Sequence, residues 1–189
     1  MTLLPTEPGA HRTIYTIGHS TRTALEFLDL LGSSCVRQLA DIRRFPASRR
    51  LPHFNSELLR RALEAAGIDY RHFEALGGRR APRSDSPHTA WKVDQFRGYA
   101  DHMESAAFAG ALSDLERWAV GAPTAIMCAE ALHFRCHRRM TADALLRDGF
   151  EVLHITGPGR LERHQYPPFA RLEPDTGRLI YDGGQLELG

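Results

Sequence analysis

Lysine is almost absent from this sequence, because Lys92 is the only lysine among 24 basic residues. The base composition of a genome explains such a bias. A need for planar, permanently charged guanidinium groups explains it equally, since these groups fit phosphate and carboxylate better than an ammonium does. The net charge is also small, at +1. The protein as a whole therefore has no strong electrostatic reason to bind nucleic acid.

Cysteine is scarce as well, and the three present are an odd number. This count argues against a secreted disulfide framework and favours a reducing cytoplasm, where cysteines close together serve metal binding or catalysis. No apolar run approaches the ~20 residues that a membrane helix needs. The N-terminus lacks a basic region followed by an apolar stretch, so no signal peptide is expected. We expect a cytoplasmic protein without membrane contact.

The chain has 189 residues, 42% of them hydrophobic, which suits one domain with a sizeable core. It contains no internal repeat and no interdomain linker. We expect a single α/β domain over 1–189, with an N-terminal extension at 1–12, a core at 13–156 and a C-terminal tail at 157–189. A short hairpin is expected in that tail, with "DTG" at its turn. The segment 79–90, rich in proline, serine and arginine, is expected to be a lid or a disordered loop.

Apolar and β-branched runs alternate with helical periodicity along the core. Strands are expected at 13–17, 35–43, 68–73, 123–128 and 150–155. Helices are expected at 21–32 with Thr21 or Thr23 as N-cap and Gly32 as C-cap, at 55–67 with Asn55 as N-cap, at 93–119 with a break near Ser105, and at 136–149. This order predicts a Rossmann-like three-layer sandwich. Its sheet has five mostly parallel strands, with helices on both faces.

Unusual polar residues follow the predicted strands. In open α/β sheets, ligands bind beyond the carboxyl ends of the strands. The residues at or just beyond those ends are Gly18, His19 and Ser20; Asp41, Arg43 and Arg44; Gly77, Gly78 and Arg79; Cys128 and Glu130; and His154. We therefore predict that the functional site lies along this one edge of the sheet.

Two of these clusters allow a structural and a functional interpretation. "IGHST" is a common kind of strand-to-helix turn, but its glycine and free N–H groups also suit an anion. In "DIRRFPASRR", Asp41 and Arg43 point to one side of a strand and can form a structural salt bridge. The neighbouring Arg44, Arg49 and Arg50, with Ser48, offer several donors to an anion of the size of phosphate.

The stretch "CAEALHFRCHRR" has the most unusual chemistry. Cys128 ends a buried strand and can be a small core residue. Glu130 is expected to face a guanidinium or a ligand, because an unpaired carboxylate at a strand mouth is costly. Cys136 and His137 fall near a helix start, where Arg135, Arg138 and Arg139 should lower the thiol pKa.

The same stretch lacks the usual ligand spacing of a metal site. The spacing Cys-x7-Cys-His lacks a paired Cys-x2-Cys, and a further ligand would have to come from His19, His154 or Glu130. No metal site is predicted, and the sequence does not identify a cofactor.

Several linked motifs resemble the bacterial domain-of-unknown-function family 488: "IGHST", "DIRRFPASR…FN", "GIDYRHFEALGGRR", "FRGYADHM" and "CAEALHFRCHRRMTADALL". The resemblance extends over residues 13–156 and includes the "FARLE…LIYDGG" tail. It implies a Rossmann-like α/β fold and a cytoplasmic protein, but no reaction. The positions that it picks out are His19, Ser20, Asp41, Arg43, Pro46, Gly77, Gly78, Cys128, Glu130, Cys136, His137 and Arg138.

Four hypotheses about function remain open. The first is an enzyme or sensor for a phosphorylated small molecule, nucleotide or nucleic-acid end. In it Arg43, Arg138 and Arg79 would hold the anion. His19 would orient the reacting group, and Glu130 or His137 would transfer a proton. The second is a thiol-dependent enzyme or redox sensor that uses Cys136 or, as a weaker candidate, Cys128.

The third hypothesis is a non-catalytic nucleic-acid-binding module, because eleven arginines against five acids give the segment from Val36 to Arg83 a net charge of +6. The fourth is a self-satisfied polar network without a ligand, in which Asp41 pairs with Arg43 and Glu130 with Arg138. The oligomeric state cannot be read from the sequence.

Overall fold

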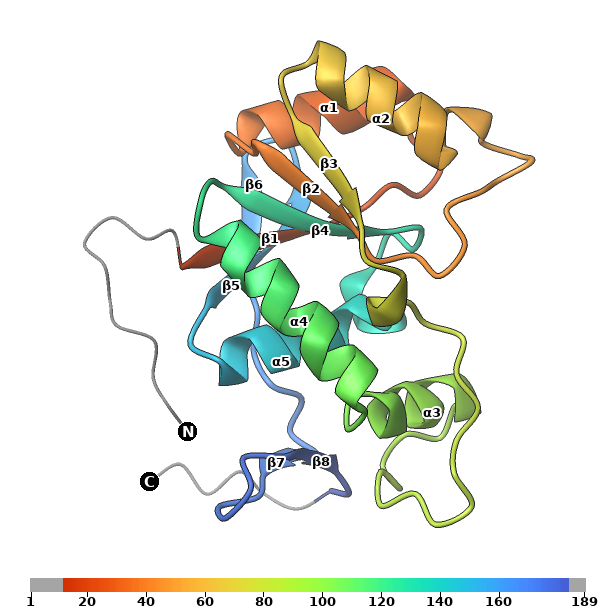
Figure 1. The fold of residues 1–189 in the computed structure, drawn as a ribbon, viewed down its shortest axis with the longest axis vertical. Coiled ribbons are helices and arrows are strands. Elements are labelled where there is room, and N and C mark those ends of the chain that lie inside the picture. The colour runs from red at the N-terminus through yellow and green to blue at the C-terminus, as the bar shows by residue number, and fades with distance from the viewer. Residues whose placement is uncertain (1–11, 184–189) are drawn as a thin grey trace.

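A sheet of six strands forms the centre of the molecule (Figure 1), in the order β3–β2–β4–β1–β5–β6. The structure is a computed structural model that describes residues 12–183, so the expected N-terminal extension, except its last residue, lies outside the described residues. The strands are β1 Thr13–Gly18, β2 Gln38–Asp41, β3 Asp69–His72, β4 Thr124–Cys128, β5 Glu151–Gly157 and β6 Arg160–Arg163. β1 to β5 are parallel, and β6 returns antiparallel to β5.

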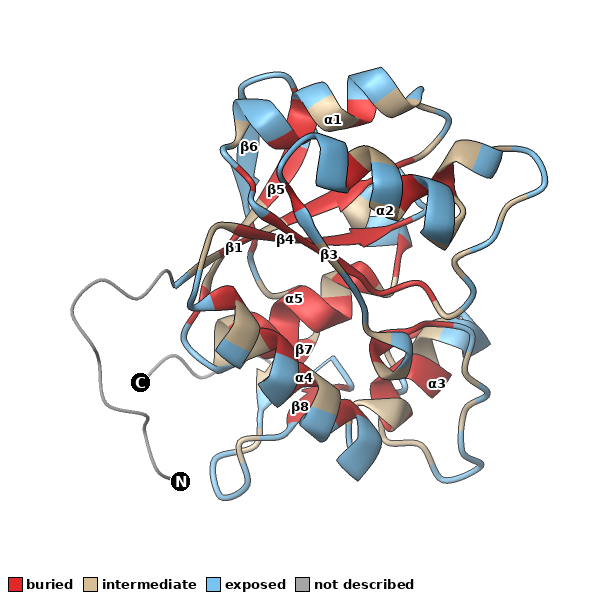
Figure 2. Cartoon of the chain, turned by 45° about the horizontal axis from the view of Figure 1, so that its top comes forward, coloured by how far each residue is buried: buried red, intermediate tan, exposed pale blue. Residues whose placement is uncertain are grey.

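Helices cover both faces of this sheet. α1 (Ala24–Ser33) and α2 (Ser56–Ala65) lie on one face, and α4 (Ala106–Ala119) and α5 (Arg138–Arg147) lie on the other, with α3 (Asp94–His102) beside them (Figure 1). Each face has its own apolar core, and β1, β2, β4 and β5, which lie between the two cores, are largely buried (Figure 2). The expected α/β fold with a Rossmann-like sandwich arrangement is confirmed.

The sheet has one strand more than the five predicted, because β6 adds an antiparallel edge. All four residues of β6 are exposed, so the strand shows none of the apolar alternation by which a half-buried strand is recognised. Its sequence, "RLER", places charged side chains along the edge of the sheet.

The C-terminal hairpin is confirmed, as β7 (Ala170–Leu172) and β8 (Leu179–Tyr181). Gly177, in the "DTG" turn, has φ of 67°, a conformation that favours glycine. The hairpin joins the main core, because Tyr181 is fully buried and its ring lies 5.6 Å from that of Trp91. Among the described residues, no helix is long and apolar enough to cross a bilayer.

The helix boundaries differ from the predictions in two details. Thr23 caps α1 and forms a capping box with Glu26, but the helix continues through Gly32 and ends at Ser33. Asn55 occupies the position before α2, yet its side-chain oxygen accepts from the backbone N–H of Ser48 rather than capping the helix. The predicted break at Ser105 is confirmed, since Ser105 caps α4.

The segment 79–90 follows a fixed path beside α3 and the hairpin. Arg83 forms an ion pair with Glu104 at 2.9 Å, and the side chain of His88 is fully buried against Tyr181. The backbone N–H of Ala90 donates to the Tyr181 carbonyl at 2.9 Å. These contacts favour an ordered strap over the alternative of a disordered loop.

Candidate functional site

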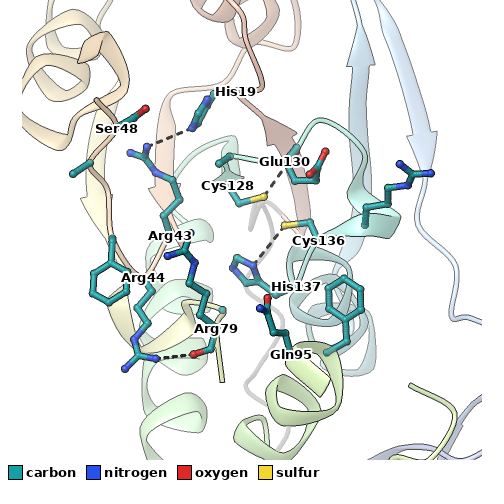
Figure 3. A pocket seen from close by; sticks show the side chains of 16 residues that line it. His19, Arg43, Arg44, Ser48, Arg79, Gln95, Cys128, Glu130, Cys136 and His137 are labelled. Carbon is teal, nitrogen blue, oxygen red and sulfur yellow. Dashed lines mark hydrogen bonds between the residues drawn. The ribbon is translucent and has the colours of Figure 1, made fainter. Parts of the chain in front are cut away.

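A pocket of about 510 Å³ opens at the carboxyl ends of β1, β2 and β4 (Figure 3). Nine of the predicted site residues line it: His19, Arg43, Arg44, Gly78, Arg79, Cys128, Glu130, Cys136 and His137. Gly18, Ser20, Asp41, Gly77 and Arg138 do not line it. His154 does not line it either, because it is buried in β5. The strand-end rule therefore located the pocket, although each side chain has its own environment.

Gly18 allows the ends of β1 and β4 to come into close contact. A Cβ at this position would lie 1.8 Å from the Glu130 carbonyl oxygen, so a side chain cannot be accommodated without a backbone shift. Beyond it, the backbone N–H of His19 donates to the Cys128 carbonyl at 3.0 Å, and that of Ser20 donates to the Ala129 carbonyl at 2.9 Å. The two loops are thus joined, and His19 is placed beside Cys128.

Asp41 positions Arg43. The Asp41 carboxylate is fully buried, and it accepts from Arg43 Nε at 2.9 Å and from the Tyr70 hydroxyl at 2.8 Å. Burial, with the Asp41 carboxylate adding to it, raises the pKa of Tyr70, which therefore remains a neutral donor. These bonds favour the salt-bridge interpretation of Asp41. They leave Arg43 Nη1 directed toward His19 at the pocket wall.

His19 presents an unprotonated nitrogen to the pocket. Its Nδ1 donates to the Ser20 carbonyl at 2.9 Å, so in the neutral ring Nε2 carries the lone pair and faces Arg43 Nη1 at 3.5 Å. The ring stacks on Phe54 at 4.1 Å. Burial, with the nearby Arg43 charge adding to it, lowers the pKa of His19 to about 4. His19 is therefore a neutral hydrogen-bond acceptor at pH 7.

His137 has a similarly fixed orientation. Its Nε2 donates to the Ile42 carbonyl at 2.9 Å, which leaves Nδ1 facing the Cys136 sulfur at 3.5 Å. Burial lowers the pKa of His137 to about 4. A Cβ at Gly78 would lie 2.9 Å from Nδ1, so the glycine leaves room for this ring. His137 Nδ1 is thus a second acceptor beside the Cys136 thiol, whose single proton goes either to Nδ1 or to the Cys128 sulfur.

Arg138 is a buried cation without a carboxylate partner. Only 1% of it is exposed, and its guanidinium donates to the carbonyls of Ile17 (2.8 Å) and Glu130 (3.1 Å) and to the Cys128 sulfur (2.9 Å). Within residues 12–183 no Asp or Glu side chain forms an ion pair with it, and its Nε has no hydrogen-bond partner. Because a buried charge is costly unless paired, the sulfur of Cys128 is its candidate counter-ion.

The two thiols of the pocket have different environments, in the opposite order from that predicted. Burial raises the pKa of Cys136 well above its usual value, although the sequence placed it at an activating helix start. Burial also opposes ionisation of Cys128, but the hydrogen bond from Cys136 and the charge of Arg138 outweigh it. The pKa of Cys128 is lowered to about 7. The side chain of Arg138 therefore favours Cys128 as the thiolate.

Glu130 was expected to face a guanidinium or a ligand, and the structure shows no guanidinium paired with its carboxylate among residues 12–183. It is exposed at the pocket rim. The predicted Glu130–Arg138 pair is absent from this part of the chain, because the guanidinium contacts the Glu130 carbonyl instead. Of the self-satisfied network considered above, only the half formed by Asp41 and Arg43 is present.

Seven pocket residues were not among the nine predicted site residues that line the pocket: Phe45, Ala47, Ser48, Gln95, Phe96, Ala129 and Arg135. Phe45 follows the arginine pair of the second strand, so its position in the sequence offered a signal. Gln95 and Phe96 belong to the first turn of α3, which is far from the strand ends in sequence. The structure describes no group of three or more His, Cys, Asp or Glu side chains within residues 12–183 that could hold a metal ion.

A chain of hydrogen bonds holds His154 away from the pocket. His154 Nδ1 lies 2.7 Å from the Thr16 hydroxyl and Nε2 lies 3.0 Å from His164 Nδ1, while His164 Nε2 lies 2.8 Å from the Asp143 carboxylate. Since a carboxylate only accepts, the neutral rings donate in one direction, toward Asp143. Burial lowers the pKa of His154 to about 2, so this ring stays neutral in the folded protein.

We expect the free energy of unfolding to fall as the pH is lowered from 7 to 5. His19 and His154 gain protons near pH 6.5 when unfolded but only at about 4 and about 2 when folded, so the unfolded state binds more protons in this range. Each contributes roughly 1 to 2 kcal/mol of loss at pH 5. Urea titrations at pH 7 and pH 5 measure the free energy of unfolding and so give this loss. The His154→Gln variant should show a smaller change of the free energy of unfolding with pH. The control His72→Gln, at an exposed position, should not. An equal change with pH in both variants would contradict the role given to His154.

Comparison with known proteins gives one match. The sequence pattern of the family described as "Domain of unknown function DUF488" matches residues 23–145, within the wider 13–156 over which the motifs suggested a resemblance. No curated protein and no solved structure matches the chain. The match covers well over half of the 189 residues. The chain therefore belongs to the DUF488 family of domains of unknown function.

Proposed function

We propose that the pocket binds a phosphorylated small molecule, a nucleotide or a nucleic-acid end. The observation that carries this proposal is a set of guanidinium groups with no carboxylate partner among the described residues. Arg44, Arg79 and Arg135 line the pocket, and Glu130 is the only acidic residue that lines it. Arg44 is held in place by donating to the Arg79 carbonyl at 2.7 Å (Figure 3). Guanidinium groups that are free of protein carboxylates suit the oxygens of a phosphate.

Two aromatic side chains favour a ligand with a planar part. Phe45 is 58% exposed and lines the pocket, and its ring lies 5.5 Å from the Arg44 guanidinium. Phe96 lines the pocket from α3. A nucleobase can stack on such a ring while its phosphate meets the arginines. The pair therefore supports a nucleotide or a nucleic-acid end over a simple sugar phosphate.

His19 is the group best placed to act on such a ligand. Its Nε2 lone pair lies at the pocket wall beside Arg43, so it can accept a hydrogen bond from a bound hydroxyl or water and orient it. The exposed carboxylate of Glu130 also lines the pocket and is available as a proton acceptor. The pocket thus has the parts of an enzyme, and without a reacting hydroxyl the same groups would make a sensor.

The arginines between Val36 and Arg83 support this pocket better than a continuous nucleic-acid-binding face. Arg60 and Arg61 pair with Glu57 on α2, and Arg71 lies over the Trp118 ring at 4.7 Å. Those guanidinium groups are engaged with other side chains and lie outside the pocket. The +6 charge is therefore divided among separate parts of the molecule rather than gathered into one basic track.

The test is a binding panel of inorganic phosphate, nucleoside mono-, di- and triphosphates, and short DNA and RNA with 5′-phosphates. We expect at least one to bind, and Arg44→Gln or Arg79→Gln to weaken it at least about 10-fold, since one charge-assisted hydrogen bond contributes about 1.5–3 kcal/mol. Thermal shift identifies the ligand and isothermal titration measures the dissociation constant.

Arg61→Gln removes the same charge from the exposed face of α2 and serves as the control. It should leave the dissociation constant unchanged. If no member of the panel binds, or if Arg61→Gln weakens binding as much as Arg44→Gln does, the proposed anion pocket is wrong.

A further inference from the structure

The floor of the pocket holds two sulfur atoms that point toward each other (Figure 3). Cys128 ends β4, and Cys136 stands two residues before α5. A hydrogen bond between the two side chains lowers the pKa of Cys128 and raises the pKa of Cys136. Although each residue is less than a tenth exposed, both line the pocket, so a small molecule inside it can reach them.

The surroundings of the two sulfurs are asymmetric. Cys128 Sγ accepts from Arg138 Nη1 at 2.9 Å, and this guanidinium has no other negatively charged group beside it among residues 12–183. Cys136 Sγ lies 3.5 Å from His137 Nδ1, which carries the lone pair of that ring. One thiol is therefore placed next to a cation that stabilises its anion, and the other next to a base that can accept its proton.

We propose that Cys128 and Cys136 form a peroxide-sensitive pair, in which the Cys128 thiolate, the counter-ion of Arg138, is oxidised first and Cys136 then closes a disulfide with it. This inference concerns the sulfur atoms alone and does not depend on which anion the pocket binds. It assigns the attacking role to Cys128 because the buried guanidinium contacts that sulfur directly.

The chemistry requires a hydroperoxide and two steps. The Cys128 thiolate attacks one peroxide oxygen, so that an S–O bond forms, the O–O bond breaks and an alkoxide or hydroxide leaves, to be protonated by water. Cys136 then attacks the resulting sulfenic sulfur. An S–S bond forms, the S–O bond breaks, and the Cys136 proton passes by way of His137 Nδ1 to the departing hydroxide, which becomes water. The two sulfurs lose two electrons and the peroxide gains them.

Oxidation would change the charge of the pocket floor. The disulfide carries no charge, so Arg138 would lose its counter-ion and the positive charge of the site would increase. We expect the oxidised protein to hold an anion in this pocket more tightly than the reduced protein does, because the thiolate no longer opposes it.

Cys35 provides a control within the same chain, because it is free and exposed while Cys128 is buried. The experiment treats the reduced full-length protein with hydrogen peroxide at pH 7, traps sulfenic acid with dimedone, blocks remaining thiols and quantifies each cysteine by peptide mass. We expect Cys128 to be lost at least about 10-fold faster than Cys35, with a Cys128–Cys136 disulfide as product. Loss of Cys35 before Cys128 would overturn the proposal.

Two variants separate the roles of the thiols. In Cys136→Ser, Cys128 should react at a similar rate and accumulate as the dimedone adduct. In Cys128→Ser, Cys136 should become unreactive. If Cys136 reacts at its original rate in Cys128→Ser, the assignment of the attacking thiol is wrong; if the unaltered protein accumulates the adduct without a disulfide, Cys136 has no resolving role. Circular dichroism confirms that each variant is folded, and the comparison with Cys35 in the unaltered protein needs no variant.

Discussion

A Gly18→Ala variant is expected to lose at least about 4 kcal/mol of its free energy of unfolding, a large part of the roughly 5–15 kcal/mol of an ordinary domain. The added Cβ would lie 1.8 Å from the Glu130 carbonyl oxygen and 3.0 Å from Arg138 Nη1. The backbone cannot move aside easily, because the hydrogen bonds from His19 to Cys128 and from Ser20 to Ala129 fix both loops. The clash thus separates the ends of β1 and β4.

Urea denaturation followed by circular dichroism measures this loss. Gly32→Ala is a matched control, because Gly32 lies within α1 and a Cβ there meets no atom within 4 Å. It should raise the free energy of unfolding by about 0.5–1 kcal/mol, since alanine restricts the unfolded chain and favours the helix. A Gly18→Ala protein that unfolds at the urea concentration of the unaltered protein would contradict the close contact described here.

Replacing Arg138 with methionine is expected to cost about 3–5 kcal/mol of stability and to remove the reactivity of Cys128. Methionine is similarly long but has no N–H groups, so the carbonyls of Ile17 and Glu130 lose their guanidinium donor. The pKa of Cys128 should rise, because burial would then act without the opposing guanidinium charge. Both effects come from one side chain.

The measurement pairs urea denaturation with the rate of Cys128 alkylation as a function of pH. Arg139→Met is the control, since Arg139 is the next residue of α5 and its guanidinium lies over the Trp91 and Phe169 rings, about 6 Å away. It should cost less than about 1 kcal/mol and leave the alkylation profile of Cys128 unchanged. If Arg138→Met keeps the original profile, Arg138 does not stabilise the thiolate.

Much of the fold was predictable because its strands and helices differ in apolar periodicity. Four of the five parallel strands are largely buried runs such as "TAIMC", β3 being the exposed exception, and the caps at Thr23 and Ser105 follow simple rules. β6 was not predictable in the same way. It pairs with β5 by backbone hydrogen bonds while its side chains face solvent, so its sequence carries no burial signal.

The site was predictable in place but not in detail. Strand order alone brings His19, Arg43 and Cys128 to one edge, because parallel strands end together. The relative acidity of the two thiols depends instead on one long side chain. Arg138 extends from the first turn of α5 to the end of β4, ten residues earlier, and contacts Cys128 rather than its neighbour Cys136 with its guanidinium. Rules that consider only the residues near the start of a helix cannot predict this contact between Arg138 and Cys128.

The position of β1 in the sheet has a consequence for synthesis on the ribosome. Ile14 pairs with Thr124 on one side and with Val152 on the other, so the first strand made is held between two of the last. This strand has no permanent neighbour until about two thirds of the chain has emerged, when β4 (Thr124–Cys128) becomes available. We therefore expect the protein to fold after translation rather than during it, and slowly for its size. Until then its apolar strands stay exposed, so folding should depend on chaperones.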